Sequence, residues 1–157
     1  MDIDLTGGNV LTVITDADPM LKRPSAAIGE PTDEIRQLAR DMLATMYAQR
    51  GIGLAAVQVA RPVRMIVLDA GSPEAPRPMV MIDPVVEWAK KRGFEMEEGC
   101  LSLPGRRMPV TRPSDIKVSY TDLAGARVTK DLGGMPARIV QHEIDHTDGV
   151  LITDRAA

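Results

Sequence analysis

The chain has 157 residues, of which 44% are hydrophobic and 26% charged, and its formal net charge is −3. This length predicts one domain over residues 1–157, with the composition of a soluble globular protein. The charge gives no basic footprint for free nucleic acid, and no apolar run is long enough for a transmembrane helix.

The N-terminal residues and the single cysteine indicate a compartment. Residues 1–5 are acidic and lack the basic region and apolar stretch of a signal peptide. Cys100 is the only cysteine, so no internal disulfide can form, which fits a reducing environment. We therefore expect a cytoplasmic protein that does not contact a membrane.

The first predicted element is a helix. Residues 1–31, rich in Asp, Pro and Gly, read mostly as loop around one apolar run at 10–14. From Thr32 onward, apolar residues recur at helical spacing, which predicts an amphipathic helix over 33–49. Thr32 is a candidate N-cap, and Gly51 is a candidate stop signal.

Strands follow this helix. Residues 64–68 and 79–82 are strand-like, and Pro84 is expected to close the second of them. Residues 116–120 alternate between polar and apolar side chains and then turn into 127–129, which predicts a hairpin.

The last predicted helix runs from Pro136 to about Asp148, with Gly149 as its stop. One stripe of this helix is mostly apolar. The neighbouring stripe holds Ile139, His142, Glu143 and His146. Such a pair of stripes is typical of a buried helix with a site on its flank.

His142, Glu143 and His146 form an H-E-x-x-H pattern, and the chain has no other histidine. Residues four apart on a helix lie one above the other, so both imidazoles can reach one metal ion. Glu143 lies beside them and can move protons on water. The pattern predicts a metal site; the alternative is a surface helix that happens to carry two histidines.

Two histidines leave a catalytic metal short of a third protein ligand. A downstream carboxylate would have to be Asp148 or Asp154, with few residues left for a second ligand helix. Cys100 is the remaining candidate, although a lone cysteine is more often an inert buried thiol. The residues alone leave the third ligand open.

The glycines of residues 51–56 stand in a G-x-G-x-x-A stretch that resembles a dinucleotide fingerprint. A helix precedes them where a strand should, and Pro62 interrupts any long helix after them. A nucleotide site is therefore disfavoured, and a tight turn would explain both glycines without a ligand.

Three segments together resemble the peptide deformylase family: residues 51–58, 98–102 and 141–146, in the family's motif order. Residues 18–21 are similar to the opening of the family's domain, and the resemblance spans roughly residues 16–155. It implies an α+β fold with small antiparallel sheets around a central metal-binding helix. It also implies a hydrolase that removes the N-formyl group from the N-terminal methionine of nascent polypeptides.

The resemblance implies the metal ligands and the base. Cys100, His142 and His146 would bind one divalent metal ion per chain. Fe(II) is the first expectation, and Zn, Ni or Co are alternatives. Glu143 would act as general base and then as general acid.

The resemblance also implies the groups that hold the substrate. Gln58 and the backbone N–H of Leu101 would bind the formyl oxygen. Gly53 would approach the substrate backbone closely. Further substrate-binding residues are expected at Gly51, Ile52, Arg107 and Ile139.

The chain departs from the family pattern at three places. Thr147 stands where Leu is usual, and Asp83 precedes Pro84 where Asn is common. The chain ends soon after Gly149, so we expect it to lack the basic C-terminal helix with which some members dock on the ribosome. Transient contact with the ribosome is left open.

Three other classes of protein share parts of these patterns. A general metallopeptidase would cleave internal peptide bonds with the same H-E-x-x-H motif. A cysteine hydrolase would use Cys100 as nucleophile and a histidine as base. A protein that only binds formyl-peptides would not need Glu143.

Asp145 lies between the two histidines and cannot share their face of the helix. A carboxylate on so apolar a helix is expected to be paired, since burial of a lone charge is costly. Among Arg106, Arg107 and Arg112 we favour Arg112, because Pro113 stiffens the chain beside it. The alternative is an Asp145 side chain that is solvated.

Overall fold

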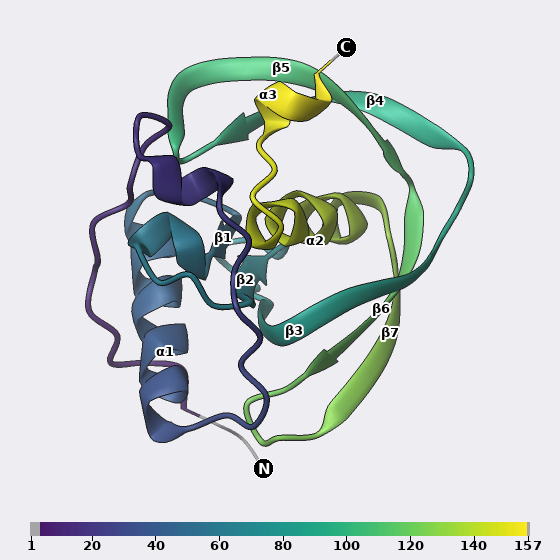
Figure 1. Cartoon of the computed structure of the whole chain (residues 1–157). Coiled ribbons are helices and arrows are strands. Elements are labelled where there is room, and N and C mark those ends of the chain that lie inside the picture. Colours follow the sequence, from purple (N-terminus) through teal and green to yellow (C-terminus); the bar gives the residue numbers. More distant parts are fainter. Residues whose placement is uncertain (1–3, 157) are drawn as a thin grey trace.

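The computed structural model describes residues 4–156, in which a long N-terminal segment leads into helices and antiparallel strands. The elements in chain order are η1 (Pro19–Lys22), α1 (Asp33–Ala48), β1 (Gly53–Ala55), η2 (Ala56–Val59), β2 (Met65–Asp69), β3 (Pro78–Ala89), β4 (Gly93–Cys100), β5 (Leu103–Pro113), β6 (Asp115–Thr121), β7 (Arg127–Gly133), α2 (Gly134–Thr147) and α3 (Ile152–Arg155). Figure 1 shows α2 in the middle of the molecule, with α1 and α3 at its periphery. The fold is α+β, as expected.

The strands form two separate antiparallel sheets. The larger sheet has the order β1-β2-β3-β6-β7, and the smaller one is the β4–β5 hairpin. The register of the hairpin shifts at Cys100, which pairs with Leu103 across a turn formed by Leu101 and Ser102. This turn fixes the position of the only thiol in the chain.

The larger sheet is packed between α1 and α2, and β2 shows how the sequence achieves this. All five residues of β2 are buried. Because side chains alternate between the faces of a strand, Ile66 and Leu68 join the cluster on the α2 side, whereas Met65 and Val67 join the α1 side.

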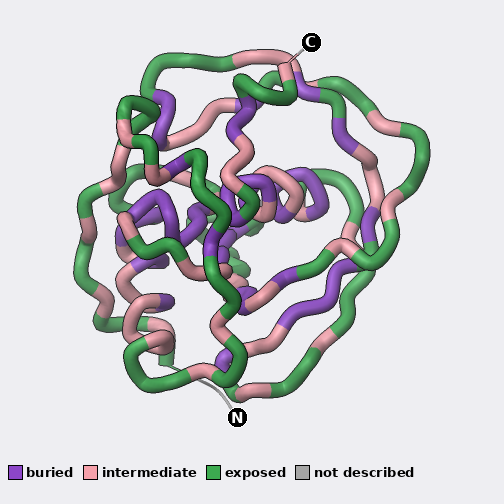
Figure 2. Tube along the Cα trace, viewed as in Figure 1, coloured by how far each residue is buried: buried purple, intermediate pink, exposed green. Residues whose placement is uncertain are grey.

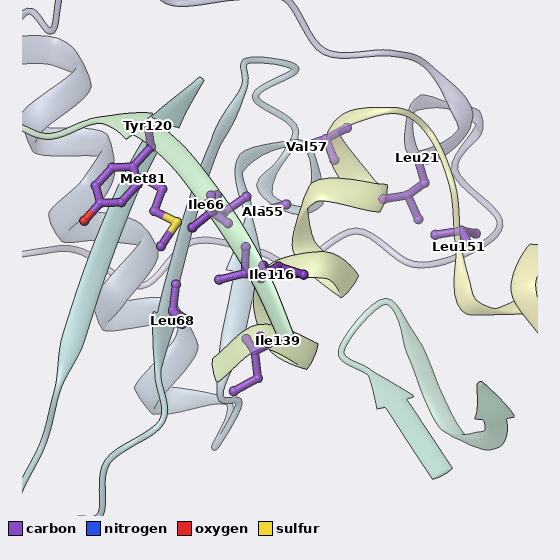
Figure 3. Packing of buried hydrophobic residues seen from close by; sticks show 13 residues of the cluster. Leu21, Ala55, Val57, Ile66, Leu68, Met81, Ile116, Tyr120, Ile139 and Leu151 are labelled. Carbon is purple, nitrogen blue, oxygen red and sulfur yellow. The ribbon is translucent and has the colours of Figure 1, made fainter. Parts of the chain in front are cut away.

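The central helix α2 is held by this core. In Figure 2 much of α2 is coloured as buried. Its residues Ala137, Ile139 and Val140 pack against the sheet, and Figure 3 shows Ile139 in one cluster with Ile66 and Ile116. Core packing therefore fixes the helix, and with it the side chains on its polar flank.

The predicted first helix is confirmed as α1, and Thr32 Oγ1 accepts the backbone N–H of Ile35 at 3.2 Å as its N-cap. The expected stop at Gly51 is displaced, because the left-handed residue after the helix is Arg50, with φ 56°. Gly51 instead leaves room for the side chain of Leu101, since a Cβ atom at Gly51 would lie 2.8 Å from Cδ1 of Leu101.

The predicted end of the second strand at Pro84 is wrong. β3 continues to Ala89, and its register against β6 shifts between Ile82 and Val85. A bulge accommodates a proline, which has no N–H for the ladder. Asp83 takes a left-handed conformation there, with φ 49°, which Asp tolerates better than most residues.

The other predicted elements are present with shifted ends. The strand expected at 64–68 is β2, and the hairpin expected at 116–120 and 127–129 is β6–β7. The last helix, α2, begins at Gly134, before Pro136. The β4–β5 hairpin and the short β1 are not among the predicted strands. Within residues 4–156, no helix is long and apolar enough to cross a bilayer.

Candidate active site and metal centre

Three side chains from two elements converge at one point. Cys100 ends β4, and His142 and His146 lie one turn apart on α2. Their ligand atoms all lie within 4.8 Å of one another, and Cys100 Sγ is 3.3 Å from Nε2 of His146. A thiolate with two imidazoles is a donor set that suits Zn, Fe(II), Ni and Co. The residues present therefore fit one divalent metal ion.

Glu98 fixes the ring of His142. Nδ1 of His142 lies 2.8 Å from Oε1 of Glu98. An ionised carboxylate only accepts hydrogen bonds, so Nδ1 carries the proton and Nε2 is left free. Nε2 of His142 is thus the atom that would face a metal ion, which binds it once its proton is released.

The protonation of the two imidazoles is biased in opposite directions. Burial lowers the pKa of His142, but the Glu143 carboxylate and other neighbouring groups outweigh it and raise the pKa to about 10. Burial, together with the positive charge of His142, lowers the pKa of His146 to about 3. The imidazole of His146 is therefore neutral at pH 7, which is the form that binds a metal ion.

Glu143 is a buried carboxyl group beside the ligand set. In the described chain, its Oε1 is buried without a hydrogen-bond partner. Burial raises the pKa of Glu143 to about 7, so the group can both accept and release a proton near neutral pH. Gly53 makes room for it: a Cβ atom at Gly53 would lie 2.6 Å from Oε2 of Glu143 and 2.7 Å from Cγ2 of Ile139.

Gln58, in η2, is oriented by hydrogen bonds at both ends of its amide. Its Oε1 accepts the backbone N–H of Ala55 at 2.9 Å, and its Nε2 donates to Oγ of Ser102 at 3.0 Å. Nε2 also lies 3.6 Å from Sγ of Cys100. One amide N–H is therefore bound to Ser102, and the other lies beside the thiol, where it can donate to a substrate oxygen.

Glu98 is surrounded by positive charge. Arg112 donates from Nε to Oε2 at 2.7 Å and from Nη2 to Oε1 at 3.0 Å, and Arg138 donates from Nη1 to Oε2. Burial opposes ionisation, but the hydrogen bonds from His142 and Arg112 prevail and lower the pKa of Glu98 to about 2. Glu98 therefore remains a carboxylate, as its hydrogen bond to His142 requires.

The predicted pair of Asp145 and Arg112 is confirmed. Arg112 Nη1 donates to Oδ2 of Asp145 at 2.9 Å, and the two side chains are only 4% and 10% exposed. Arg155 adds a second cation, with Nε 2.6 Å from Oδ2 and Nη2 2.8 Å from Oδ1 of Asp145. Asp145 is thus a shared acceptor and not a solvated side chain.

A cavity of about 710 Å³ opens in front of these groups. The predicted substrate-binding residues all line it: Gly51, Ile52, Gly53, Arg107 and Ile139. So do the other predicted site residues except one: Gln58, Cys100, Leu101, His142 and Glu143. The exception, His146, is almost completely buried behind them. The structure brings all the predicted site residues together.

Ser102, Glu98 and Arg138 also take part in the site, although no role is expected for them from the sequence. The role of Arg138 could have been predicted from its spacing. It precedes His142 by one helical turn and can therefore reach the same carboxylate, that of Glu98. Ser102 and Glu98 carry no local signal beyond their position beside Cys100.

Comparison with known sequences identifies the family. The family model described as polypeptide deformylase matches residues 10–157. A peptide deformylase of Picosynechococcus sp. is 45% identical over 140 residues, which cover 88% of this chain and 74% of that protein. A peptide deformylase of Orientia tsutsugamushi (strain Boryong) is 40% identical over 156 residues, which cover 93% of this chain and 86% of that protein.

Solved structures agree with the sequence comparison. Peptide deformylase from Thermotoga maritima matches with a TM-score of 0.90 and 34% identity, covering 95% of this chain and 99% of that one. A Met-Ala-Ser-bound class I type b peptide deformylase from Acinetobacter baumannii matches with a TM-score of 0.88 and 35% identity, covering 95% and 99%. The resemblance carried by three short segments extends over nearly the whole chain. The chain belongs to the peptide deformylase family, metal-dependent hydrolases that remove the N-formyl group from nascent polypeptides.

Proposed function

We propose that this deformylase acts with Cys100, His142 and His146 as the ligands of one divalent ion and with Glu143 as the group that moves protons. The observation that carries the proposal is the convergence of a thiol and two imidazoles within 4.8 Å, beside a buried carboxyl group. A divalent ion bound there supplies Lewis-acid chemistry, because it polarises a carbonyl oxygen and makes water acidic enough to lose a proton near neutral pH.

Glu143 accepts a proton from the attacking water and delivers it to the departing amine nitrogen. The C–N bond of the formyl amide breaks, and the products are formate and a free N-terminal amine. A pKa of about 7 suits Glu143 to both proton transfers. Gln58 Nε2 and the N–H of Leu101 donate to the formyl oxygen as negative charge develops on it.

We assign substrate binding to residues on several sides of the cavity. Residues 51–53 lead into β1, an edge strand of the larger sheet, and an edge strand can pair with an extended peptide. Ile139 and Arg107 line the same cavity. The Met-Ala-Ser bound to the Acinetobacter baumannii relative supports a peptide ligand of this kind here.

For the ion we propose Fe(II), with Zn, Ni or Co as alternatives, since a mixed thiolate and imidazole set suits all four. Cys100 must remain reduced to bind an ion, which supports action in the cytoplasm. The partners are N-formyl-methionyl nascent polypeptides. The net charge of −3 offers no support for binding free nucleic acid. We take residues 1–157 as one domain.

The test is anaerobic purification with metal analysis, coupled to release of formate from formyl-Met-Ala-Ser. We expect about one ion per chain, loss of hydrolysis with a chelator, and recovery with Fe(II), Co or Ni. Cys100→Ala should lose the ion. Full activity in a verified metal-free sample, abolished by thiol alkylation alone, would instead support a cysteine hydrolase. Cleavage of unformylated peptides at internal bonds would support a general metallopeptidase.

A further inference from the structure

We infer that Arg155 is a positioning residue for the metal ligands, and that α3 holds the β4–β5 hairpin against α2. The inference rests on the proposed function, because it takes Cys100, His142 and His146 as the ligand set. Among the described residues, none in α3 lines the cavity, so the effect would reach the site only through other side chains.

The ligand set is divided between two parts of the molecule. β4, which ends at Cys100, pairs with β5 and with no strand of the larger sheet in the described chain. α2, which carries both histidines, packs in the core against the larger sheet. The 3.3 Å separation of Cys100 Sγ and His146 Nε2 therefore depends on contacts that seat the hairpin on the helix.

The first set of contacts between α3 and the site is ionic. Arg155 binds both carboxylate oxygens of Asp145 on α2, at 2.6 and 2.8 Å. Asp145 also accepts a hydrogen bond from Arg112 on β5 at 2.9 Å. Arg112 donates two hydrogen bonds to Glu98 on β4, and Glu98 accepts Nδ1–H of His142 at 2.8 Å. Charged hydrogen bonds thus lead from α3 to a metal ligand without a break.

The second set of contacts made by α3 is apolar. Ile152, at the start of α3, is buried with Leu103 and Val110 in a small cluster that Cys100 and Met108 join. Leu103 is also the residue that pairs with Cys100 across the hairpin turn. The helix α3 therefore contacts the cysteine side of the ligand set through Ile152 and the histidine side through Arg155.

Loss of Arg155 should disturb Arg112 in particular. The side chain of Asp145 is 10% exposed, and without Arg155 its remaining side-chain partner within residues 4–156 would be Arg112. Arg112 also serves Glu98, and the two carboxylates would then compete for one guanidinium. The hydrogen bond from Nδ1 of His142 to Glu98 would be less firmly oriented, and loss of a hydrogen-bond partner of a metal-binding histidine typically lowers metal affinity about 10–100-fold.

The experiment measures how fast Co(II)-loaded protein loses its ion to excess EDTA, followed by the visible absorption of Co(II). We expect Arg155→Gln to lose the ion about 10-fold faster than the unaltered protein. Arg155→Lys keeps the charge but not the bidentate geometry and should be intermediate. Ile152→Ala should also lose the ion faster. Lys22→Ala is the matched control, since it removes an exposed ion pair to Asp154 on the same helix and should leave the rate unchanged.

A purely structural role predicts a different pattern. Arg155→Gln would then lower the melting temperature of the metal-free and Co(II)-loaded proteins equally, with an unchanged rate of ion loss, and that result would overturn the inference. If Arg155→Gln does not fold, an unchanged rate in Arg155→Lys overturns it. Retention of the ion by Cys100→Ala would instead refute the ligand set of the proposed function, whereas the rate of ion loss from Arg155→Gln decides the role of Arg155 separately.

Discussion

Gln58 Nε2 donates a hydrogen bond to Oγ of Ser102 at 3.0 Å, and the two residues are 1% and 0% exposed. The bond joins η2 to the turn that follows Cys100. Since Oε1 of Gln58 accepts the N–H of Ala55, the amide has one consistent orientation. The donor is therefore set before the substrate binds, which is the property that stabilisation of a developing oxyanion requires.

We predict that Gln58→Ala lowers kcat about 10²–10³-fold and changes KM little, because one oxyanion donor is lost. Ser102→Ala should cause a smaller loss, since the amide remains but is less firmly held. Steady-state hydrolysis of formyl-Met-Ala-Ser checks both variants. An effect confined to KM would mean that Gln58 binds the ground state only.

We predict that Glu143→Ala keeps its metal ion and loses about 10²–10⁴-fold in rate, because a positioned base is removed while the ligands remain. Metal analysis and kcat should be measured on the same preparation. A metal-free, unfolded Glu143→Ala protein would show that the carboxyl group is structural.

We predict that Gly53→Ala lowers kcat about 10²-fold while the fold and the metal content are retained. A Cβ atom would lie 2.6 Å from Oε2 of Glu143, so the base must move, and small displacements of a catalytic group are costly. Gly51→Ala is the comparison, because its Cβ would first meet the far end of the Leu101 side chain, at 2.8 Å. Its effect should be milder. Equal kcat values for Gly53→Ala and the unaltered protein would contradict the close approach.

We predict that Asp145→Ala and Arg112→Ala each lower the free energy of unfolding, by at most about 3–5 kcal/mol, because each removes one partner from a buried network of charges whose remaining members keep fewer hydrogen bonds. The double variant should lose less than the sum of the two. Urea unfolding of all four proteins completes the cycle. A nearly unchanged melting temperature for Asp145→Ala would rule out a buried pair that matters for stability.

We predict that Glu98 makes folding stability depend on acid pH. The pKa of Glu98 is lowered from 4.5 to about 2, so its contribution is fully present above pH 4.5 and is lost as the pH falls toward 2. The difference in unfolding free energy between the unaltered protein and Glu98→Gln should therefore shrink over this range. A chelator should be present throughout, so that ion release does not contribute.

Glu97→Gln is the control for the pH experiment, since Glu97 is the exposed neighbour on the same strand. Its difference from the unaltered protein should stay small and flat with pH. A constant gap for Glu98→Gln between pH 6 and pH 3 would show that the carboxyl group does not titrate as its environment requires.

The metal-binding helix could be predicted closely because its signal is local. Two histidines four residues apart need only a helix to share a face, and the structure supplies that helix as α2. The pairing of Asp145 with Arg112 was predictable because burial of a lone charge is costly and few cations were available. The second partner of Asp145, Arg155, could not be predicted, because nothing in the local sequence shows that α3 packs beside α2.

The β4–β5 hairpin shows the limit of periodicity. Few residues of its strands are buried, and β5 contains two internal prolines and a glycine, so no regular alternation marks it. It is held by pairing within the hairpin and by a small apolar cluster. Cys100 at its end could be connected to the histidines only through the resemblance to a family, since the ligand set forms through tertiary packing.

Within the part of the chain that the structure describes, the β4–β5 hairpin pairs with no strand of the larger sheet, which bears on how long an ion stays bound. Its backbone amides are shielded by one another and by the side chains that seat it on α2 and α3. Local opening of such a unit requires less free energy than global unfolding. Each opening would carry the thiol of Cys100 away from both imidazoles. Hydrogen exchange at the hairpin amides and escape of the ion would then share one step, and the opening rate would set the lifetime of the bound metal.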